Sequence, residues 1–332
     1  MKNLKKLAGY ILCLALVIGC ISGCGGFAGK SDEELLMSSI TSLNKAKSFE
    51  MNTKLTGKIS VKAGEQSQDT ELNMDMTSTQ FTEPMKAKVL MKTSSAGMTM
   101  DTESYIQKEN DNYVTYTKAG GVWSKMSMGN LDEAMNAAGG MNSMQKQLAE
   151  DVSKYTKKED RKEGDKTYLV YEYKVTGEDM KSMVNSAMST LGSSLGSDDE
   201  LSEMLEAMLG KMGDLVMTIL IDRDAECIAS IEMPMTDMMN NMMSGLVDYM
   251  KQQVAEEGGE DTEGMDEYFD QMQMQVTDMN MVAKYSKIDA ADDFMIPKEA
   301  LEAEETSLED EDLDTDDAGS DLDDAEEEDA ES

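Results

Sequence analysis

Two cysteines four residues apart, Cys20 and Cys24, carry the clearest chemistry in this sequence. Each is preceded by a glycine and, three positions earlier, by a branched apolar residue. This spacing is typical of a bacterial lipoprotein signal, in which the cysteine thiol is joined to a diacylglycerol. We favour Cys24 and keep Cys20 as the alternative, because Ile21-Ser22-Gly23 is closer to the usual pattern and Gly25-Gly26 gives a flexible tether.

The N-terminus has the layout of an export signal. Lys2, Lys5 and Lys6 precede an apolar run from residue 7 to residue 21, which is too short to span a bilayer. We therefore expect residues 1–23 to be a lipoprotein signal peptide and residues 24–30 a lipidated flexible tether. The diacylglycerol on Cys24 would then anchor the chain at the extracytoplasmic face of the cell membrane.

Catalytic chemistry is limited by the absence of histidine from the whole sequence. Residues 192–196 match the G-x-S-x-G pattern of serine hydrolases, but no imidazole is present to activate the serine. Residues 24–31 resemble a phosphate-binding loop, but Cys24 stands where the first glycine belongs and no strand precedes it. We expect a protein that is not an enzyme and that needs no cofactor.

Metal binding has little support either. Asp314, Asp316 and Gly319 take positions one, three and six of a calcium loop, but alanines occupy positions five and twelve. The 34 methionines include pairs at 238–239 and 242–243, whose thioethers suit copper(I). Most methionines, however, fall on the apolar phase of predicted strands and helices, where they fill a core or a deformable apolar pocket. We predict no metal site.

Charge excludes other partners. The chain has 67 acidic and 30 basic residues, and its net charge of -37 opposes binding to nucleic acid or to an anionic bilayer. Residues 302–332 hold 18 of the carboxylates and no lysine or arginine. We predict that this segment is a disordered acidic tail, with loose association of divalent cations left open.

Hydrophobic periodicity divides the rest of the chain into helices and strands. A capping box at residues 31–34 begins a helix that we expect to run to about Lys47. Alternation predicts a hairpin over 113–126 and strands over 51–61, 72–76, 85–91, 98–106, 169–175, 215–221, 227–235 and 272–285. Helical spacing predicts amphipathic helices over 180–191, 201–212 and 239–254, and a weaker one over 131–152.

Two details concern single strands. The apolar phase of the last strand flips near Thr277-Asp278, which predicts a β-bulge. Cys227 is in phase with Ala229, Ile231 and Met233, so we expect its thiol to be buried and inert.

Strands with one polar face need a cover on the other face, and the helices supply it. We predict an α+β domain over residues 31–301, in which helices cover the apolar concave face of a curved antiparallel β-sheet, a half-barrel. A hydrophobic ligand between sheet and helices would contact inward apolar residues of several strands. The predicted lining residues are Met51, Leu55, Ile59, Met74, Met76, Val89, Met91, Trp123, Met217, Ile219 and Met233.

Several runs together resemble a known family. They are the lipoprotein signal, the helix end "NKAKSFEMNTKLTG", the hairpin run "GGVWSKM" and the closing run "YSKIDAADDFMIPKEA". This layout resembles a family of Gram-positive lipoproteins of unknown function, whose fold is similar to the LolA and LppX class of lipid carriers. The resemblance covers about residues 31–300 and implies a half-barrel that holds acyl chains under a lid of helices.

Two hypotheses follow. The first is a membrane-anchored, non-enzymatic lipoprotein that binds a lipid or another hydrophobic ligand between sheet and helices. The alternative is a structural or interaction lipoprotein of the cell envelope, with a solid core and an acidic tail that binds cations or a basic partner.

Overall fold

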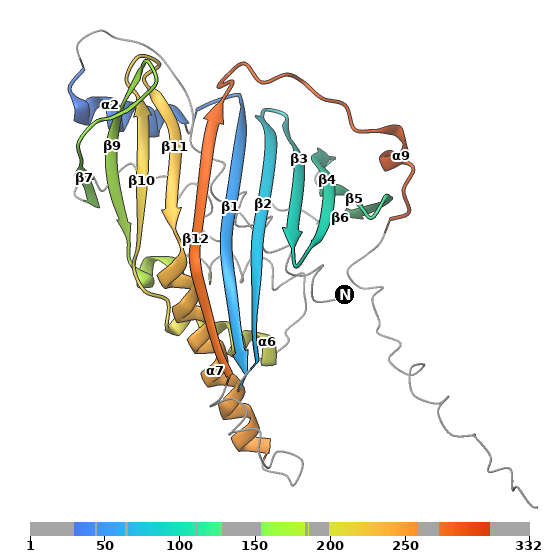
Figure 1. Cartoon of the computed structure of the whole chain (residues 1–332). Coiled ribbons are helices and arrows are strands. Elements are labelled where there is room, and N and C mark those ends of the chain that lie inside the picture. The colour runs from blue at the N-terminus through green and yellow to red at the C-terminus, as the bar shows by residue number, and fades with distance from the viewer. Residues whose placement is uncertain are drawn as a thin grey trace, which may run out of the picture.

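An open antiparallel sheet forms the body of the protein in the computed structural model (Figure 1). The structure describes residues 30–43, 45–63, 66–110, 112–127, 154–182, 185, 199–257 and 272–305. Within these residues, the sheet has 12 strands in the order β6-β5-β4-β3-β2-β1-β12-β11-β10-β9-β7, and β8 pairs with β9. The predicted α+β class, with a large antiparallel sheet and a few helices, is confirmed.

The strands differ greatly in length. They are β1 (Ser48–Ala63), β2 (Gln66–Thr82), β3 (Met85–Ser95), β4 (Met98–Glu109), β5 (Asn112–Ala119), β6 (Val122–Ser127), β7 (Tyr155–Lys157), β8 (Arg161–Glu163), β9 (Lys166–Val175), β10 (Leu215–Asp222), β11 (Cys227–Pro234) and β12 (Met272–Ser286). Alternation predicts all of them except β7 and β8, which have three residues each. β2 is longer than predicted because its polar first half pairs with β1 along its whole length.

The chain builds the sheet as two meanders joined by its last strand. β1 to β6 follow one another across one half, and β9 to β11 form the other half. β12 lies between β1 and β11 and pairs with both. The sheet therefore has one continuous face on each side, and strand register assigns every side chain to one of them.

The bulge predicted near Thr277-Asp278 is confirmed. The register of β1 with β12 shifts between Thr56 and Lys58, and Asp278 has a positive φ of 53°. A Cβ atom on Gly57 would lie 2.7 Å from the Met279 sulfur, so a larger residue opposite the bulge would require the Met279 side chain to shift. After the shift, Met279 and Val276 are buried on the same side as the inward residues of β1.

The first helix, α2 (Asp32–Leu43), begins with the predicted capping box. Ser31 N donates to Glu34 Oε2 at 2.8 Å, and Glu34 N donates to Ser31 Oγ at 3.2 Å. The apolar side of α2 joins the main core and packs on β10 and β11. Lys30 pairs with Glu226 at 3.1 Å, which fixes the start of the helix to the turn before β11.

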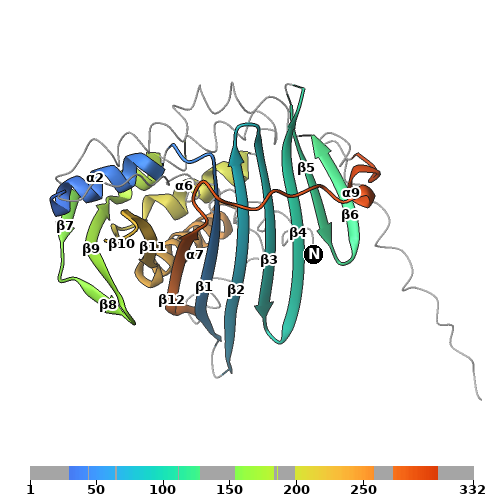
Figure 2. The same ribbon diagram turned by 90° about the horizontal axis from the view of Figure 1, so that it is seen from above.

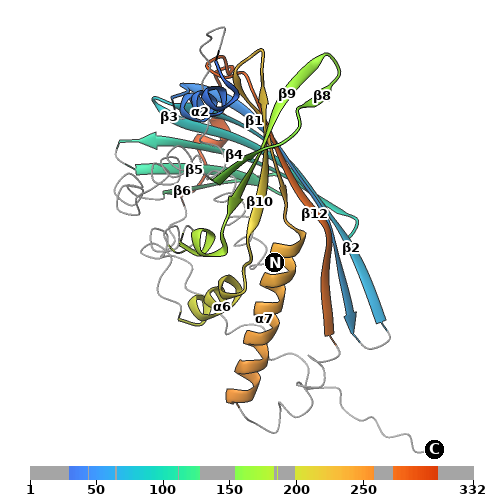
Figure 3. The ribbon, with the colours of Figure 1, turned by 90° about the vertical axis from the view of Figure 1, so that its left-hand side faces the viewer.

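Two methionine-rich helices, α6 (Asp199–Gly210) and α7 (Thr236–Glu257), lie on the same side of the sheet as α2 (Figure 3). α7 follows β11 directly and packs against β12. The Asn240 side chain donates to Val276 O at 2.9 Å and accepts from Val276 N at 2.7 Å. At this point of β12, α7 therefore makes the backbone hydrogen bonds that a neighbouring strand would otherwise make. We call this helix-bearing side of the sheet the inner face.

The chain after β12 crosses the opposite side, the outer face, as an extended segment that we call the strap (residues 287–305). Figure 2 shows it crossing from β12 to the edge strand β6, where it ends in α9 (Lys298–Leu301). Asp289 N donates to Ser48 O at 2.7 Å, and Lys125 Nζ contacts Glu305 at 3.1 Å. Ordered contacts therefore continue four residues beyond the predicted domain boundary at residue 301.

Other predictions lie partly or wholly outside the described residues. These are Cys20 and Cys24, the signal peptide and tether up to residue 29, the helix over 131–152, most of the helix over 180–191, and the tail from residue 306.

Candidate functional site

The inner face is the candidate site, and its apolar centre is built from neighbouring strands in register. On β1, Met51, Thr53 and Leu55 point inward, and they face Ser78, Met76 and Met74 on β2. β3 continues the rows with Val89 and Met91, and β12 does so with Tyr285, Ala283 and Met281. The apolar residues of this set belong to one core cluster, which also includes apolar residues of α2 and α7.

Ten of the eleven predicted lining residues lie on this face. Met51, Met74, Met76, Val89, Met91, Ile219 and Met233 are buried in the core cluster. Leu55, Ile59 and Met217 are only half-buried and pack against the margin of the cluster. The structure therefore brings these residues together, with a closed centre and a partly open margin.

Trp123 lies on the other side of the sheet, which corrects its placement among the lining residues. It is opposite Lys118 in the β5–β6 register, and its ring lies 6.0 Å from that of Tyr105 on the outer face. Phe294, Ile296 and Ala300 of the strap pack with both rings in a separate cluster. The hairpin carries large apolar side chains on both faces, so alternation alone did not identify the correct one.

Cys227 also differs from its prediction. The register of β10 with β11 shifts after Leu220, so that Ile228 enters the core and Cys227 stands opposite Asp222 on the outer side. The residue is half-buried and lies outside the core cluster. The extra residue is Ala229, and nothing in the apolar pattern marks it as a bulge.

The margin of the inner face is covered by α6 and α7, and their methionines were not among the predicted lining residues. Met239, Met242 and Met243 of α7 are half-buried and, like Leu55 and Ile59, pack against the core cluster. The helices approach closely at Gly245, where a Cβ atom would lie 2.5 Å from Ala207 O. The amphipathic spacing of these methionines in the sequence was the signal that could have identified them as part of the cover. Their unbranched thioether chains adapt to an apolar surface.

The inner face changes character toward β5. Ser78 accepts a hydrogen bond from Gln80 Nε2 at 3.3 Å, and the hydroxyls of Ser104 and Thr117 lie 3.2 Å apart. Burial raises the pKa of Tyr285. Burial is also the main reason that the pKa of Tyr171 is raised to about 12, and the carboxylates of Asp32, Glu33 and Asp160 contribute less. Both tyrosines are therefore neutral at physiological pH, and this part of the face is uncharged.

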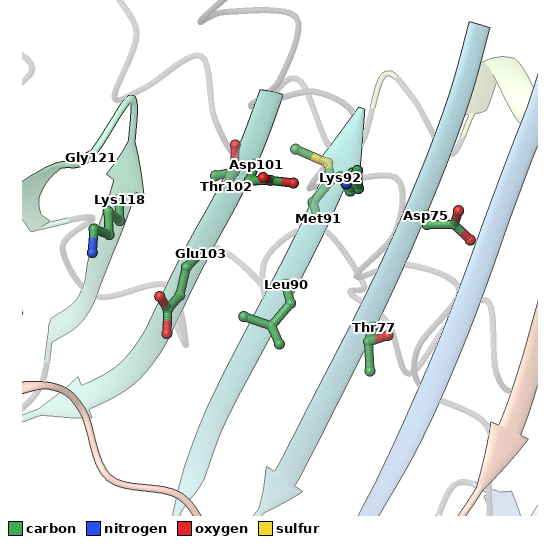
Figure 4. Close-up of a pocket in the computed structure, with 10 residues that line it drawn as sticks. All are labelled: Asp75, Thr77, Leu90, Met91, Lys92, Asp101, Thr102, Glu103, Lys118 and Gly121. Carbon is green, nitrogen blue, oxygen red and sulfur yellow. The ribbon is translucent and has the colours of Figure 1, made fainter. Parts of the chain in front are cut away.

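The outer face holds a shallow hollow of about 510 Å³ across β2 to β5 (Figure 4). Lys54, Asp75, Lys92 and Asp101 succeed one another across four strands, so positive and negative side chains alternate. Lys54 and Asp75 are 3.3 Å apart and more than half exposed. Such matched charges are typical of a solvated sheet face, and we assign no ligand to this hollow.

The described part of the chain holds no group of three or more cysteine, aspartate or glutamate side chains placed to bind a metal ion. None of its helices combines the length and the apolar character needed to cross a bilayer.

Comparison with known proteins assigns the family. Residues 31–257 match a family of unknown function, DUF6612, and because this is more than half of the chain, the protein belongs to that family. The predicted membership in a family of unknown function is confirmed, whereas lipoprotein status and a Gram-positive source stay predictions. No curated protein matches the sequence.

Solved structures with a similar arrangement include two mycobacterial proteins. The lipoprotein LppX of Mycobacterium tuberculosis is 11% identical, with a TM-score of 0.36 over 79% of this chain and 99% of that chain. LprF of Mycobacterium bovis is 11% identical, with a TM-score of 0.37 over 80% of this chain and 96% of that chain. A β-barrel-like protein of Brucella abortus is 9% identical, with a TM-score of 0.22 over 73% and 98% of the two chains.

Proposed function

We propose that this protein is a membrane-anchored, extracytoplasmic lipoprotein that binds a lipid or another hydrophobic ligand on its inner face and catalyses no reaction. The observation that carries the proposal is the half-buried margin of the apolar face. Leu55 and Ile59 of β1 and Met217 of β10 retain accessible surface beside a fully buried centre. Acyl chains that cover such side chains gain free energy in proportion to the apolar area removed from water.

The composition of the margin favours a ligand of variable shape. Half-buried methionines of α7 and branched residues of β1 both pack against the core cluster, so the margin combines flexible and branched apolar side chains. The described inner face near β1 carries no charged side chain, so the bound part of the ligand is apolar or neutral. The anchor is the diacylglycerol proposed on Cys24.

The proposal is tested by native mass spectrometry of the full chain purified from cells. We expect a co-purified lipid whose occupancy falls in the variants Leu55→Trp and Ile59→Trp, because the larger rings fill the margin. Leu90→Trp is the matched control, since Leu90 is 41% exposed on the outer face of β3. Occupancy should be unchanged in this control.

A chain that carries no lipid and takes up none when incubated with membrane lipid extract would refute the carrier proposal. The structural or interaction role, with a solid core, would then stand. Equal loss of lipid in the Leu90→Trp control would also count against the inner face as the site.

A further inference from the structure

Two buried hydroxyl groups on the inner face have no hydrogen-bond partner. Among the described residues, Thr53 Oγ1 and Tyr171 OH are the buried side-chain oxygens or nitrogens in this condition. Thr53 is 1% exposed and Tyr171 is 3% exposed. Native proteins pair nearly all buried polar groups, because an unpaired one loses its hydrogen bonds to water without replacement.

Both residues belong to one row across the sheet. The row runs from Tyr171 through Ile219, Ile231 and Ala283 to Thr53. At a strand spacing of roughly 4.8 Å, the backbone positions of the two residues are about 19 Å apart. Everything between them in the row is apolar, so no side chain of the row reaches either group.

Thr53 is the more informative of the two. Tyr171 lies within electrostatic reach of four charged residues: Asp32 and Glu33 at the start of α2, and Asp160 and Arg223 from other segments. Thr53 instead has Met76 opposite it on β2 and Ala283 opposite it on β12. Other inward hydroxyls are paired, as the contact of Ser104 with Thr117 illustrates. The hydroxyl residues Ser78 and Tyr285 lie on its diagonals, but neither is hydrogen-bonded to Thr53. Thr53 Oγ1 is thus an unpaired donor on a largely apolar part of the face.

The cover around Thr53 can rearrange to admit a ligand. Four of its neighbours along the strand, opposite and on the diagonals are methionines: Met51, Met74, Met76 and Met281. The other neighbours are Leu55, Ala283, Ser78 and Tyr285. Methionine has no branch and three rotatable bonds, so these side chains can repack without moving the sheet. A group that binds there must fit among apolar side chains and accept one hydrogen bond.

We propose that Thr53 Oγ1 donates a hydrogen bond to the acyl-ester carbonyl of a neutral lipid bound on the inner face; this inference rests on the proposed function. A carbonyl is a neutral acceptor that arrives attached to acyl chains. A fatty-acid carboxylate fits less well, because the residues around Thr53 include no cation to pair with a buried charge. A plain hydrocarbon leaves the hydroxyl unpaired.

The test compares two lipids of equal chain length, an ester-linked diacylglycerol and the corresponding ether-linked dialkylglycerol. Full chain immobilised on beads and stripped of lipid is loaded with a fluorescent diacylglycerol, and displacement by each unlabelled lipid is measured. We expect the wild type to prefer the ester about five- to tenfold, the effect of one hydrogen bond. Thr53→Val, which keeps the shape, should abolish the preference.

Two further variants complete the design. Thr117→Val removes an inward hydroxyl that is already paired with Ser104 and should leave the preference intact. Thr53→Ser keeps the donor and should retain the preference. Where Thr53→Val does not fold, Thr53→Ala serves as the hydroxyl-free variant, and the wild-type ratio by itself decides whether an ester is recognised.

The outcomes separate the two proposals. Equal displacement by ester and ether in the wild type overturns ester recognition and leaves lipid binding standing. A preference that persists in Thr53→Val overturns the assignment to Thr53. Failure of the fluorescent lipid to bind at all overturns the proposed function, and this inference with it.

Discussion

Asp222 shows how one residue is stabilised on the outer face. Among the residues that the structure describes, Asp222 is the one charged residue that is buried, with 4% of its surface exposed. Burial raises its pKa, but the Lys166 ammonium at 2.6 Å and the N–H groups of Asp224 and Ala225, each at 3.1 Å, outweigh burial and lower it. The carboxylate therefore holds the β10–β11 turn while it is ionised.

We expect Asp222→Asn to lower the free energy of unfolding at pH 7 by about 1–3 kcal/mol, because the amide cannot pair with Lys166. A folded pKa below the ordinary value of 3.8 means that the contribution is complete above that value and is lost as pH falls further. The difference between wild type and variant, followed by urea unfolding, should be constant near neutrality and shrink below about pH 4. A difference that grows in acid would contradict the ionised state.

The anchor is a second prediction at this scale. Cys24→Ala should release the protein from the membrane or mislocalise it, because no diacylglycerol can be attached. Cys20→Ala should leave membrane retention unchanged. Fractionation of cells that express each variant measures this, and the reverse pattern would assign the lipid to Cys20.

Among the elements, the strap shows how a segment without regular structure is held. Phe294 packs 5.9 Å from the Phe81 ring and 5.8 Å from the Tyr105 ring, and Lys86 lies over Phe81 and Phe294 at 4.9 and 5.0 Å. Lys86 also pairs with Asp293. The strap thus buries aromatic side chains that would otherwise leave the outer face of β4 to β6 apolar and exposed.

Phe294→Ala should detach this part of the strap and cost about 1–3 kcal/mol of stability, since the ring is half-buried. The single tryptophan, Trp123, reports it, because the residue packs in the same cluster. We expect its emission to shift to the red and its quenching by acrylamide to increase. The neighbouring Met295 is 89% exposed, and Met295→Ala should change neither signal.

Prediction from sequence succeeded for elements with a long regular pattern. β1 and β12 alternate over many residues, and the phase flip at Asp278 gave the bulge because every later side chain changed sides. The Ala229 bulge was missed because only two residues of β11, Cys227 and Ile228, precede it and show the changed phase. The strap was missed as an element because its contacts depend on tertiary packing and not on a repeat.

The candidate site was predicted to the same degree. Inward residues of β1, β2 and β3 were identified because the other face of each strand is largely polar. The unpaired hydroxyl of Thr53 was not identified, because threonine fits either face of a strand. Only the register of β1 with β2 and β12 shows that most of its neighbours are apolar.

The molecule as a whole depends on a strand beyond the family match. That match ends at residue 257, yet β12 (Met272–Ser286) joins the two meanders at the centre of the sheet. Without β12, both β1 and β11 would present an unpaired edge with apolar side chains.

We therefore expect a chain that ends at residue 257 to aggregate or remain unfolded, as judged by solubility and circular dichroism. A chain that ends at residue 305 retains every described strand and should fold with an unchanged melting temperature. A soluble, cooperatively folded 1–257 fragment would show that the two meanders are joined by other contacts.

The position of β12 also sets the order of events during synthesis. The ribosome makes β1 early, but β12, which pairs with one edge of β1, is completed only at Ser286. The first meander can form while the chain grows, whereas the union of the two halves must wait until nearly all of the protein has been made. Such distant pairing slows folding, because a long loop has to close before the contacts stabilise it. A polypeptide of this design stays loosely folded for longer, and so remains a substrate for chaperones until its last strand arrives.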